Sequence, residues 1–130
     1  MSGLQLSALF LFLLNTAGLL LHSQLIPRGR IRAGMFCFYT NQSNLLLTVY
    51  ELLLLCAGFW PGGRLWAVLT DVRLSCAMAL YMWVTHLIYQ FVLVPEQKRK
   101  GQRFADFGGS FGNICVHYLS PLLAVAQRLF

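Results

Sequence analysis

The stretch that decides the fold is GLQLSALFLFLLNTAGLLLHS, residues 3–23, which holds no charged side chain. About 20 residues of helix rise roughly 30 Å, the thickness of the hydrocarbon core of a bilayer. A secretory signal peptide needs basic residues before its apolar core, and here the first basic residue is Arg28. The stretch is therefore predicted to be a retained transmembrane helix.

Three further apolar segments follow, separated by glycine, proline or charged residues. They cover approximately residues 35–60, 65–94 and 107–128. Pro61-Gly62-Gly63 is predicted to stop the first of these segments, and Pro95 is predicted to close the second. We therefore expect an all-α fold, a polytopic transmembrane bundle of about four helices that forms a single domain over residues 1–130.

Composition and charge support a membrane protein over a nucleic-acid binder. Of the 130 residues 58% are hydrophobic and only 11% are charged, too little charge to coat a soluble domain of this size. The net charge of +6 would suit phosphate binding, but the basic residues stand between apolar runs, so no nucleic-acid partner is expected. Seven of them follow the first and third spans: Arg28, Arg30, Arg32, Lys98, Arg99, Lys100 and Arg103.

The distribution of these basic residues also predicts an orientation. Positively charged loops stay in the cytoplasm, so both basic loops are expected inside and both termini outside. Arg64 and Arg128 fall on the opposite side and are interpreted as topology alone. The four cysteines, Cys37, Cys56, Cys76 and Cys115, lack CxxC or Cys/His metal spacing, so no disulfide, metal or cofactor is expected.

Polar residues inside the apolar segments form two helical faces, and such residues are costly in hydrocarbon. One face carries Thr40, Asn44, Thr48 and Glu51, and the other carries Ser110, Asn113, His117 and Pro121. A hydroxyl and an imidazole at compatible depth are the two parts of a base-activated nucleophile, which makes Thr40 and His117 the candidate catalytic pair. Intramembrane threonine and asparagine also bond their own helix or join helices, and Glu51 is alternatively a solvated acid near the outer interface.

Small residues mark another side of the last span. Gly108 and Gly112, with Ala105 and Gly109 beside them, have the GxxxG spacing that lets a neighbouring backbone approach closely. We expect this face to pack against a helix, and a homo-oligomer formed through Gly108 and Gly112 is one alternative.

Two segments carry a resemblance to a known family. FYTNQSNLL (Phe38–Leu46) and NICVHYLSPLL (Asn113–Leu123) are similar to bacterial six-span integral membrane proteins related to the androgen-induced family. VTHLIYQFVL (Val84–Leu93) fits the helix between them. That family includes the androgen-dependent regulator of tissue factor pathway inhibitor, and its animal members hydrolyse fatty acid esters of hydroxy fatty acids with a threonine and a histidine.

The resemblance implies catalytic roles for Thr40 and His117 and a location in the bacterial inner membrane. The chain departs from the family in two ways. It has about four spans where the family has six, so it is expected to be a shortened form. The proline after the histidine, Pro121, lies one residue nearer to it than in the animal proteins.

The leading hypothesis is therefore an intramembrane hydrolase of lipid esters, with membrane lipids as partners. Thr40 would attack the ester carbonyl and His117 would act as general base and then acid. The groups expected to donate to the oxyanion or orient the imidazole are Asn44, Asn113, Asn41 and Ser43, of which Ser43 is also the backup nucleophile. Other polar candidates are Glu51, Thr85, His86 and Tyr89.

Two alternatives stay open. The first is a non-catalytic membrane module that binds lipid or a partner subunit, with the same polar groups bonding between helices. The second is a small transporter component in which Glu51 and His117 carry protons.

Overall fold

The computed structural model describes residues 1–22, 29, 39–103 and 111–129, and these residues form helices and turns without a strand. The all-α prediction is confirmed. The helical elements in chain order are α1 (Gly3–His22), α3 (Tyr39–Ala57), α4 (Arg64–Leu69), α5 (Val72–Ile88), the π-helical η2 (Tyr89–Leu93), α6 (Val94–Arg99), α8 (Phe111–Ile114), the π-helical η3 (Cys115–Leu119) and α9 (Ser120–Leu129).

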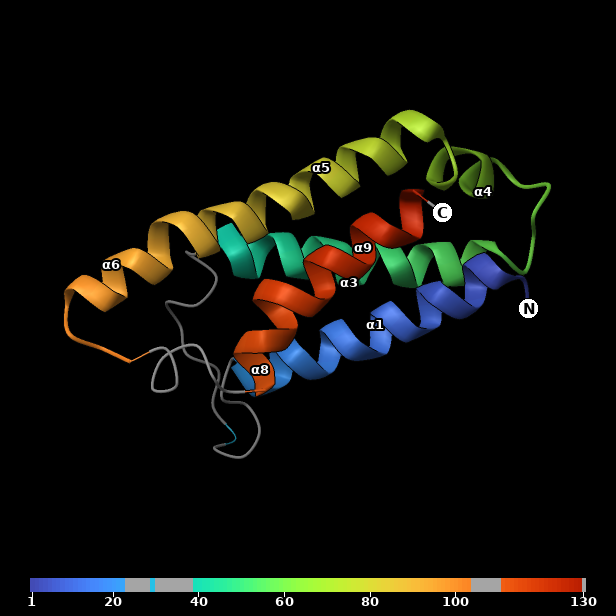
Figure 1. Cartoon of the computed structure of the whole chain (residues 1–130). Helices are drawn as coiled ribbons and strands as arrows, with labels where there is room; N and C mark the ends of the chain where they lie inside the picture. The colour runs from blue at the N-terminus through green and yellow to red at the C-terminus, as the bar shows by residue number, and fades with distance from the viewer. Residues whose placement is uncertain (23–28, 30–38, 104–110, 130) are drawn as a thin grey trace.

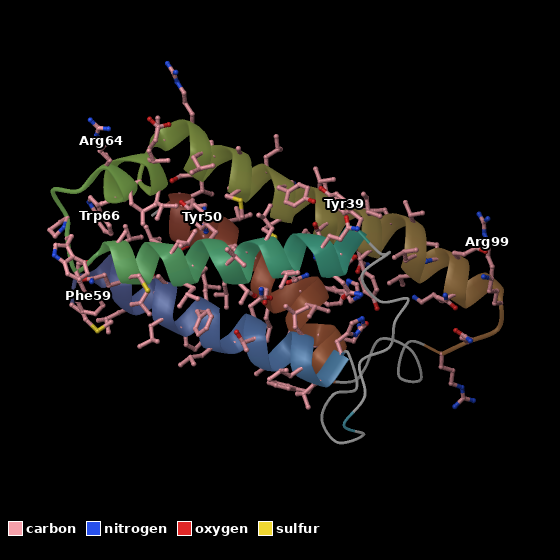
Figure 2. All side chains as sticks on the ribbon, turned by 180° about the vertical axis from the view of Figure 1, so that it is seen from behind. Tyr39, Tyr50, Phe59, Arg64, Trp66 and Arg99 are labelled. Atoms are coloured by element: carbon pink, nitrogen blue, oxygen red, sulfur yellow. The ribbon has the colours of Figure 1, made fainter. Side chains whose placement is uncertain are left out.

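The long helices form a bundle with two distinct ends (Figure 1). α1 packs along α3, α5 packs against α9 and α3, and the run α8–η3–α9 also contacts α1. α3 and α8–η3–α9 run in the same direction, as predicted. The N-terminus, α4 and the end of α9 lie at one end, called the α4 end below, and α6 and α8 lie at the other, called the α6 end. Figure 2 shows Phe59 and Trp66 at the α4 end and Arg99 at the α6 end.

The predicted third span, residues 65–94, begins within one residue of α4 at Arg64, but it is neither continuous nor closed by Pro95. It is divided after α4, because Asp71 caps a new helix: its side chain accepts a hydrogen bond from the Arg73 N–H at 2.8 Å. It also continues past Pro95 to Arg99. The other predicted limits agree within a few residues, except that 35–38 and 107–110 lie outside the described residues.

The helix passes through Pro95 because a π-helical turn precedes it. Proline has no N–H and its ring presses on the carbonyl four residues back, which usually kinks or ends an α-helix. In η2 the Val94 N–H donates to the Tyr89 carbonyl five residues back. The backbone just before Pro95 is therefore already wider than an α-helix and does not depend on the four-residue pairing that proline disrupts. The same arrangement recurs in η3, where the Ser120 N–H donates to the Cys115 carbonyl just before Pro121.

The bundle buries polar side chains and exposes apolar ones. Completely buried polar residues include Asn15, Ser43, Asn44, Glu51, Thr85 and Ser120. Large exposed apolar residues include Phe10, Leu13, Leu46, Leu80, Phe91 and Leu122. Two helical segments, Gly3–His22 and Val72–Arg99, have the length and hydropathy of a membrane span, a criterion that a buried core helix or a signal sequence also meets.

Candidate functional site

The π-helical turn η3 and the proline after it, Pro121, leave two backbone carbonyls that other helices bind. In an α-helix the Val116 carbonyl would accept from the Ser120 N–H, which here donates to Cys115 instead. The His117 carbonyl would accept from residue 121, a proline without an N–H. Asn44 Nδ2 of α3 donates to the Val116 carbonyl at 2.9 Å. The two freed carbonyls are thus anchoring points for neighbouring helices.

His86 of α5 binds the second freed carbonyl. Its Nδ1 lies 2.9 Å from the His117 carbonyl oxygen. Because a carbonyl only accepts, Nδ1 of His86 must carry the hydrogen. His86 therefore joins α5 to η3, which is a structural role and leaves it no free Nδ1 for the candidate reaction.

The His117 imidazole lies buried among aromatic rings. Its side chain stacks on Tyr89 with ring centroids 3.5 Å apart and 14° between the planes. The ring of His22, at the end of α1, meets it edge-on at 5.7 Å. His117 is 5% exposed, and its Nδ1 is buried with no hydrogen-bond partner among the described residues. A buried nitrogen without a partner is uncommon and calls for a reason.

Tyr89 and Asn113 form the wall beside this imidazole. Asn113 Nδ2 donates to the Tyr89 hydroxyl at 2.8 Å, and both residues are buried. Asn113 thereby helps to fix the ring that stacks on His117. Asn113 is predicted either to donate to the oxyanion or to orient the imidazole. The contact fits orientation, because Asn113 holds Tyr89 and Tyr89 stacks on His117.

Thr40 lies in the first turn of α3, at the same end of the bundle. It is 6% exposed. Its carbonyl oxygen accepts from Asn44 Nδ2 at 2.8 Å and from the Ser43 hydroxyl at 2.9 Å. Among the described residues its own hydroxyl has no hydrogen-bond partner, and no hydrogen bond joins it to His117. Asn44 nevertheless connects the two segments, because its amide bonds both Thr40 and the residue before His117.

The sequence predicts that Asn44 donates to an oxyanion or orients the imidazole, but its amide donates to backbone carbonyls of α3 and η3 instead. Both N–H groups of its amide are committed, one to the Thr40 carbonyl and one to the Val116 carbonyl. Its backbone carbonyl accepts from Asn15 Nδ2 of α1 at 2.5 Å. Asn44 is a junction between helices, and Asn15 is a member of this junction that the sequence interpretation missed.

Ser43 is also committed within the bundle. Its hydroxyl donates to the Thr40 carbonyl and accepts from the Thr85 hydroxyl of α5 at 2.8 Å. A hydroxyl with its proton engaged in this way is poorly placed as a nucleophile, so the backup role of Ser43 is not supported. Asn41 is buried beside these residues, at 2% exposure.

Several acceptors near the site are buried without a described partner. They are the side-chain oxygens of Asn15, Asn44 and Ser120. Buried acceptors of this kind are commonly satisfied by internal water. The arrangement therefore combines an unpaired hydroxyl, an unpaired imidazole nitrogen and positions suited to water.

Glu51 lies apart from this site, toward the α4 end, and the interpretation of Glu51 as a solvated acid is wrong. Its side chain is completely buried, and Oε1 accepts from Arg128 Nη2 at 2.7 Å. Its Oε2 accepts from Gln127 Nε2 at 3.2 Å, and Gln127 Nε2 also contacts the Ser7 hydroxyl at 2.9 Å. Arg128, interpreted as a topology signal, is therefore the buried partner of Glu51.

The small-residue face serves a contact within the chain. A Cβ on Gly112 would lie 2.9 Å from both the Leu21 Cβ and the backbone nitrogen of His22, so α8 crosses the end of α1 closely there. A homo-oligomer formed through Gly108 and Gly112 stays a prediction. Gly108, Ser110 and Cys37 lie outside the described residues.

Metal ligands do not gather in the described part of the chain, where no group of three His, Cys, Asp or Glu side chains could hold an ion. No protein-family model, curated protein or solved structure matches the chain. Its function is therefore inferred from the site and from the resemblance of its two motifs.

Proposed function

We propose that the chain spans a membrane with four helical segments, α1, α3, α4–α6 and α8–α9. The support is the large number of exposed apolar side chains, together with the polar side chains that are buried beside an apolar core. A water-soluble bundle would reverse that pattern, since exposed apolar patches favour association. In the proposed orientation the α6 end, with Lys98, Arg99, Lys100 and Arg103, faces the cytoplasm, and the α4 end and both termini face outward.

Residue accessibility tests this placement. In a variant without native cysteines, a cysteine at Gly62 should react with a membrane-impermeant maleimide added to intact cells. A cysteine at Lys100 should react only after the cells are opened. Equal labelling of both positions in intact cells, or recovery of the protein in the soluble fraction, would contradict the placement.

Within this membrane bundle, we propose that the α6 end hydrolyses lipid esters. The observation that carries the proposal is the pairing pattern. The Thr40 hydroxyl and the His117 Nδ1 have no described partners, while the polar groups around them bond to one another across helices. Groups left unpaired in this way are available to a substrate, and the resemblance of both motifs to a threonine–histidine hydrolase family points to the same two residues.

The proposed reaction follows the chemistry of an activated hydroxyl. Thr40 Oγ1 attacks the ester carbonyl carbon while the neutral His117 imidazole takes the hydroxyl proton. The tetrahedral intermediate collapses, the carbon–oxygen bond to the alcohol breaks, and His117 returns the proton to the leaving alkoxide. A water molecule then attacks the acyl-threonine by the same route, which releases the fatty acid and restores Thr40.

The test is ester hydrolysis by purified protein, with p-nitrophenyl decanoate as substrate. Thr40→Ala and His117→Ala should each lower the rate by at least about 100-fold, because each removes one half of an acid–base pair. Thr70→Ala is the control, since the Thr70 hydroxyl bonds only the Trp66 carbonyl of its own turn, at the α4 end. Hydrolysis that persists in both variants would refute the assignment.

A covalent probe gives an independent readout. A fluorophosphonate should label the wild-type protein at Thr40, as located by mass spectrometry of the labelled peptide. Labelling at Ser43 would move the nucleophile to the neighbouring hydroxyl.

One observation favours a second candidate, a non-catalytic module that binds lipid or another subunit. Thr40 and His117 are not hydrogen-bonded to each other, and Asn44, Ser43 and His86 all join helices. Catalytic hydrogen bonds are often long before substrate binds, so the missing bond does not decide between the two. If the wild-type protein neither cleaves the ester nor reacts with the probe, the binding module is the better account.

A further inference from the structure

A cavity of about 140 Å³ lies at the α4 end, separate from the site around His117. Its lining is half apolar and half polar, and comes from the ends of four helical segments. The lining residues are Leu4, Tyr50, Leu54, Leu69, Thr70, Ser75, Gln127 and Arg128. Figure 2 shows Tyr50 on α3, on the same half of the bundle as Phe59 and Trp66.

Arg128 gives this cavity an unsatisfied donor. Its side chain is 5% exposed, and the guanidinium lies 4.8 Å from the centre of the Tyr50 ring. Nη2 donates to Glu51, and Nη1 donates to the Ala124 carbonyl at 2.9 Å and to Gln127 at 2.6 Å. The Nε–H is buried with no partner among the described residues. A buried charged group with one N–H unpaired is a prepared position for an acceptor oxygen.

The charge of the site selects an uncharged ligand. Glu51 already balances Arg128, so an incoming phosphate or carboxylate would be the second anion beside one guanidinium. A hydroxyl or an ester carbonyl supplies the acceptor without that repulsion. The Tyr50 and Thr70 hydroxyls donate to the Leu69 and Trp66 carbonyls, and each keeps a lone pair that can accept from a ligand hydroxyl.

The size of the cavity and its place in the bundle further limit the class of ligand that fits. A protein cavity of about 150 Å³ holds benzene, so this one suits a group of about six heavy atoms, the size of glycerol. It lies at the α4 end, which also carries Phe59, and Phe59 and the next residue, Trp60, are 63% and 75% exposed. Aromatic side chains gather at the level of the lipid headgroups, which is also where glycerol and its ester bonds lie. Leu4, Leu54 and Leu69 provide an apolar side for the start of an acyl chain.

We propose that this cavity binds the uncharged headgroup of a neutral glyceride, with an oxygen of the glycerol unit or its ester on Arg128 Nε. The proposal rests on the membrane placement of the chain and is independent of the hydrolytic reaction. It assigns the α4 end a lipid site in the outer half of the bilayer, at the opposite end of the bundle from Thr40 and His117.

The test is photo-crosslinking of the full-length protein in native membranes. The probe is a monoacylglycerol with a diazirine near the headgroup end of its acyl chain and a terminal alkyne. Labelling should map to peptides that contain Leu54 or Ser75, and unlabelled monoacylglycerol should compete for it. The same chain as a free fatty acid, and as phosphatidylglycerol, should label these peptides at least about tenfold less.

Two variants of the lining and one control variant keep the test specific. Ser75→Phe fills the cavity from its lining, and Ala77→Phe puts the same ring on an exposed position of the same helix. Arg128→Lys keeps the charge beside Glu51 but removes the Nε–H and the planar fork. Ser75→Phe and Arg128→Lys should lower labelling about tenfold, the size expected for one lost hydrogen bond or a blocked site, and Ala77→Phe should leave it unchanged.

If neither Ser75→Phe nor Arg128→Lys lowers the labelling, the proposal is overturned. Equal labelling by the fatty acid or by phosphatidylglycerol would also overturn it. These results are distinguishable from failure of the proposed reaction, which is measured by ester cleavage at Thr40. They are also distinguishable from failure of the membrane placement, which is measured by cysteine accessibility.

Discussion

The two ends of the bundle differ in the polar side chains that carry their main buried contacts. At the α4 end the Glu51 carboxylate has a charged partner on one oxygen and an amide on the other. At the α6 end a hydroxyl on Thr40 and a nitrogen on His117 have no described partners. Paired buried charges hold a structure together only while both are present, whereas unpaired groups cost stability and are kept where they react or bind. Glu51 and Arg128 therefore have a structural role as an ion pair, and the proposed function gives Thr40 and His117 a chemical one.

The largest expected effect comes from breaking the paired end. Glu51→Ala leaves Arg128 buried without its counter-charge, and we expect the unfolding free energy to fall by about 3–5 kcal/mol. Unfolding in mixed micelles with rising SDS measures the change. The double variant E51M/R128M removes both charges and should recover most of the loss. If E51M/R128M is as unstable as the single variant, the packing of these side chains matters more than their pairing.

The next effect tests how closely α8 crosses α1 at the other end. A methyl group on Gly112 would meet the backbone of His22 at 2.9 Å, so Gly112→Ala must push the two helices apart. We expect a loss of about 1–3 kcal/mol and a lower rate of ester cleavage, because His22 packs against the His117 ring. Gly3→Ala is the control, since nothing lies within 4 Å of a Cβ there. Equal stability of both variants would contradict the close crossing.

A smaller effect is expected for the bond between α5 and α3. Thr85→Val keeps the shape of the side chain but removes the donor to Ser43, and we expect a loss of about 1–2 kcal/mol in the same unfolding assay. Thr70→Val removes a hydroxyl that bonds only within its own helix turn, to the Trp66 carbonyl, and should cost less. If Thr70→Val costs as much, the link between the helices adds little.

The smallest effect on stability is expected at the proposed catalytic imidazole. His117→Leu removes the unpaired buried Nδ1, which favours the variant, and also removes the stacking on Tyr89, which disfavours it. We expect the unfolding free energy to change by less than about 1 kcal/mol while ester cleavage is lost. A large loss of stability would show that His117 is structural and would sharpen the case for the non-catalytic module.

The amino-acid sequence alone determined the all-α class, both ends of α1 and the last residues of α3 to within a few positions, and the two polar faces. These features depend on local chemistry: apolar runs, glycine and proline, and the spacing of polar residues along one helix. The sequence also singled out Thr40, His117 and Glu51, because a polar group in an apolar run needs a partner or a function.

Tertiary structure alone decided which partners those residues received. Glu51 meets Arg128, 77 positions away, and Asn44 meets a carbonyl that the π-helical turn before Pro121 leaves free. Such contacts depend on how whole helices are rotated and aligned against one another. A local sequence pattern does not determine that arrangement. That is why the sequence named Asn44 and Glu51 as polar candidates without their partners. In the packed bundle Asn44 joins helices, and Glu51 is half of a buried ion pair.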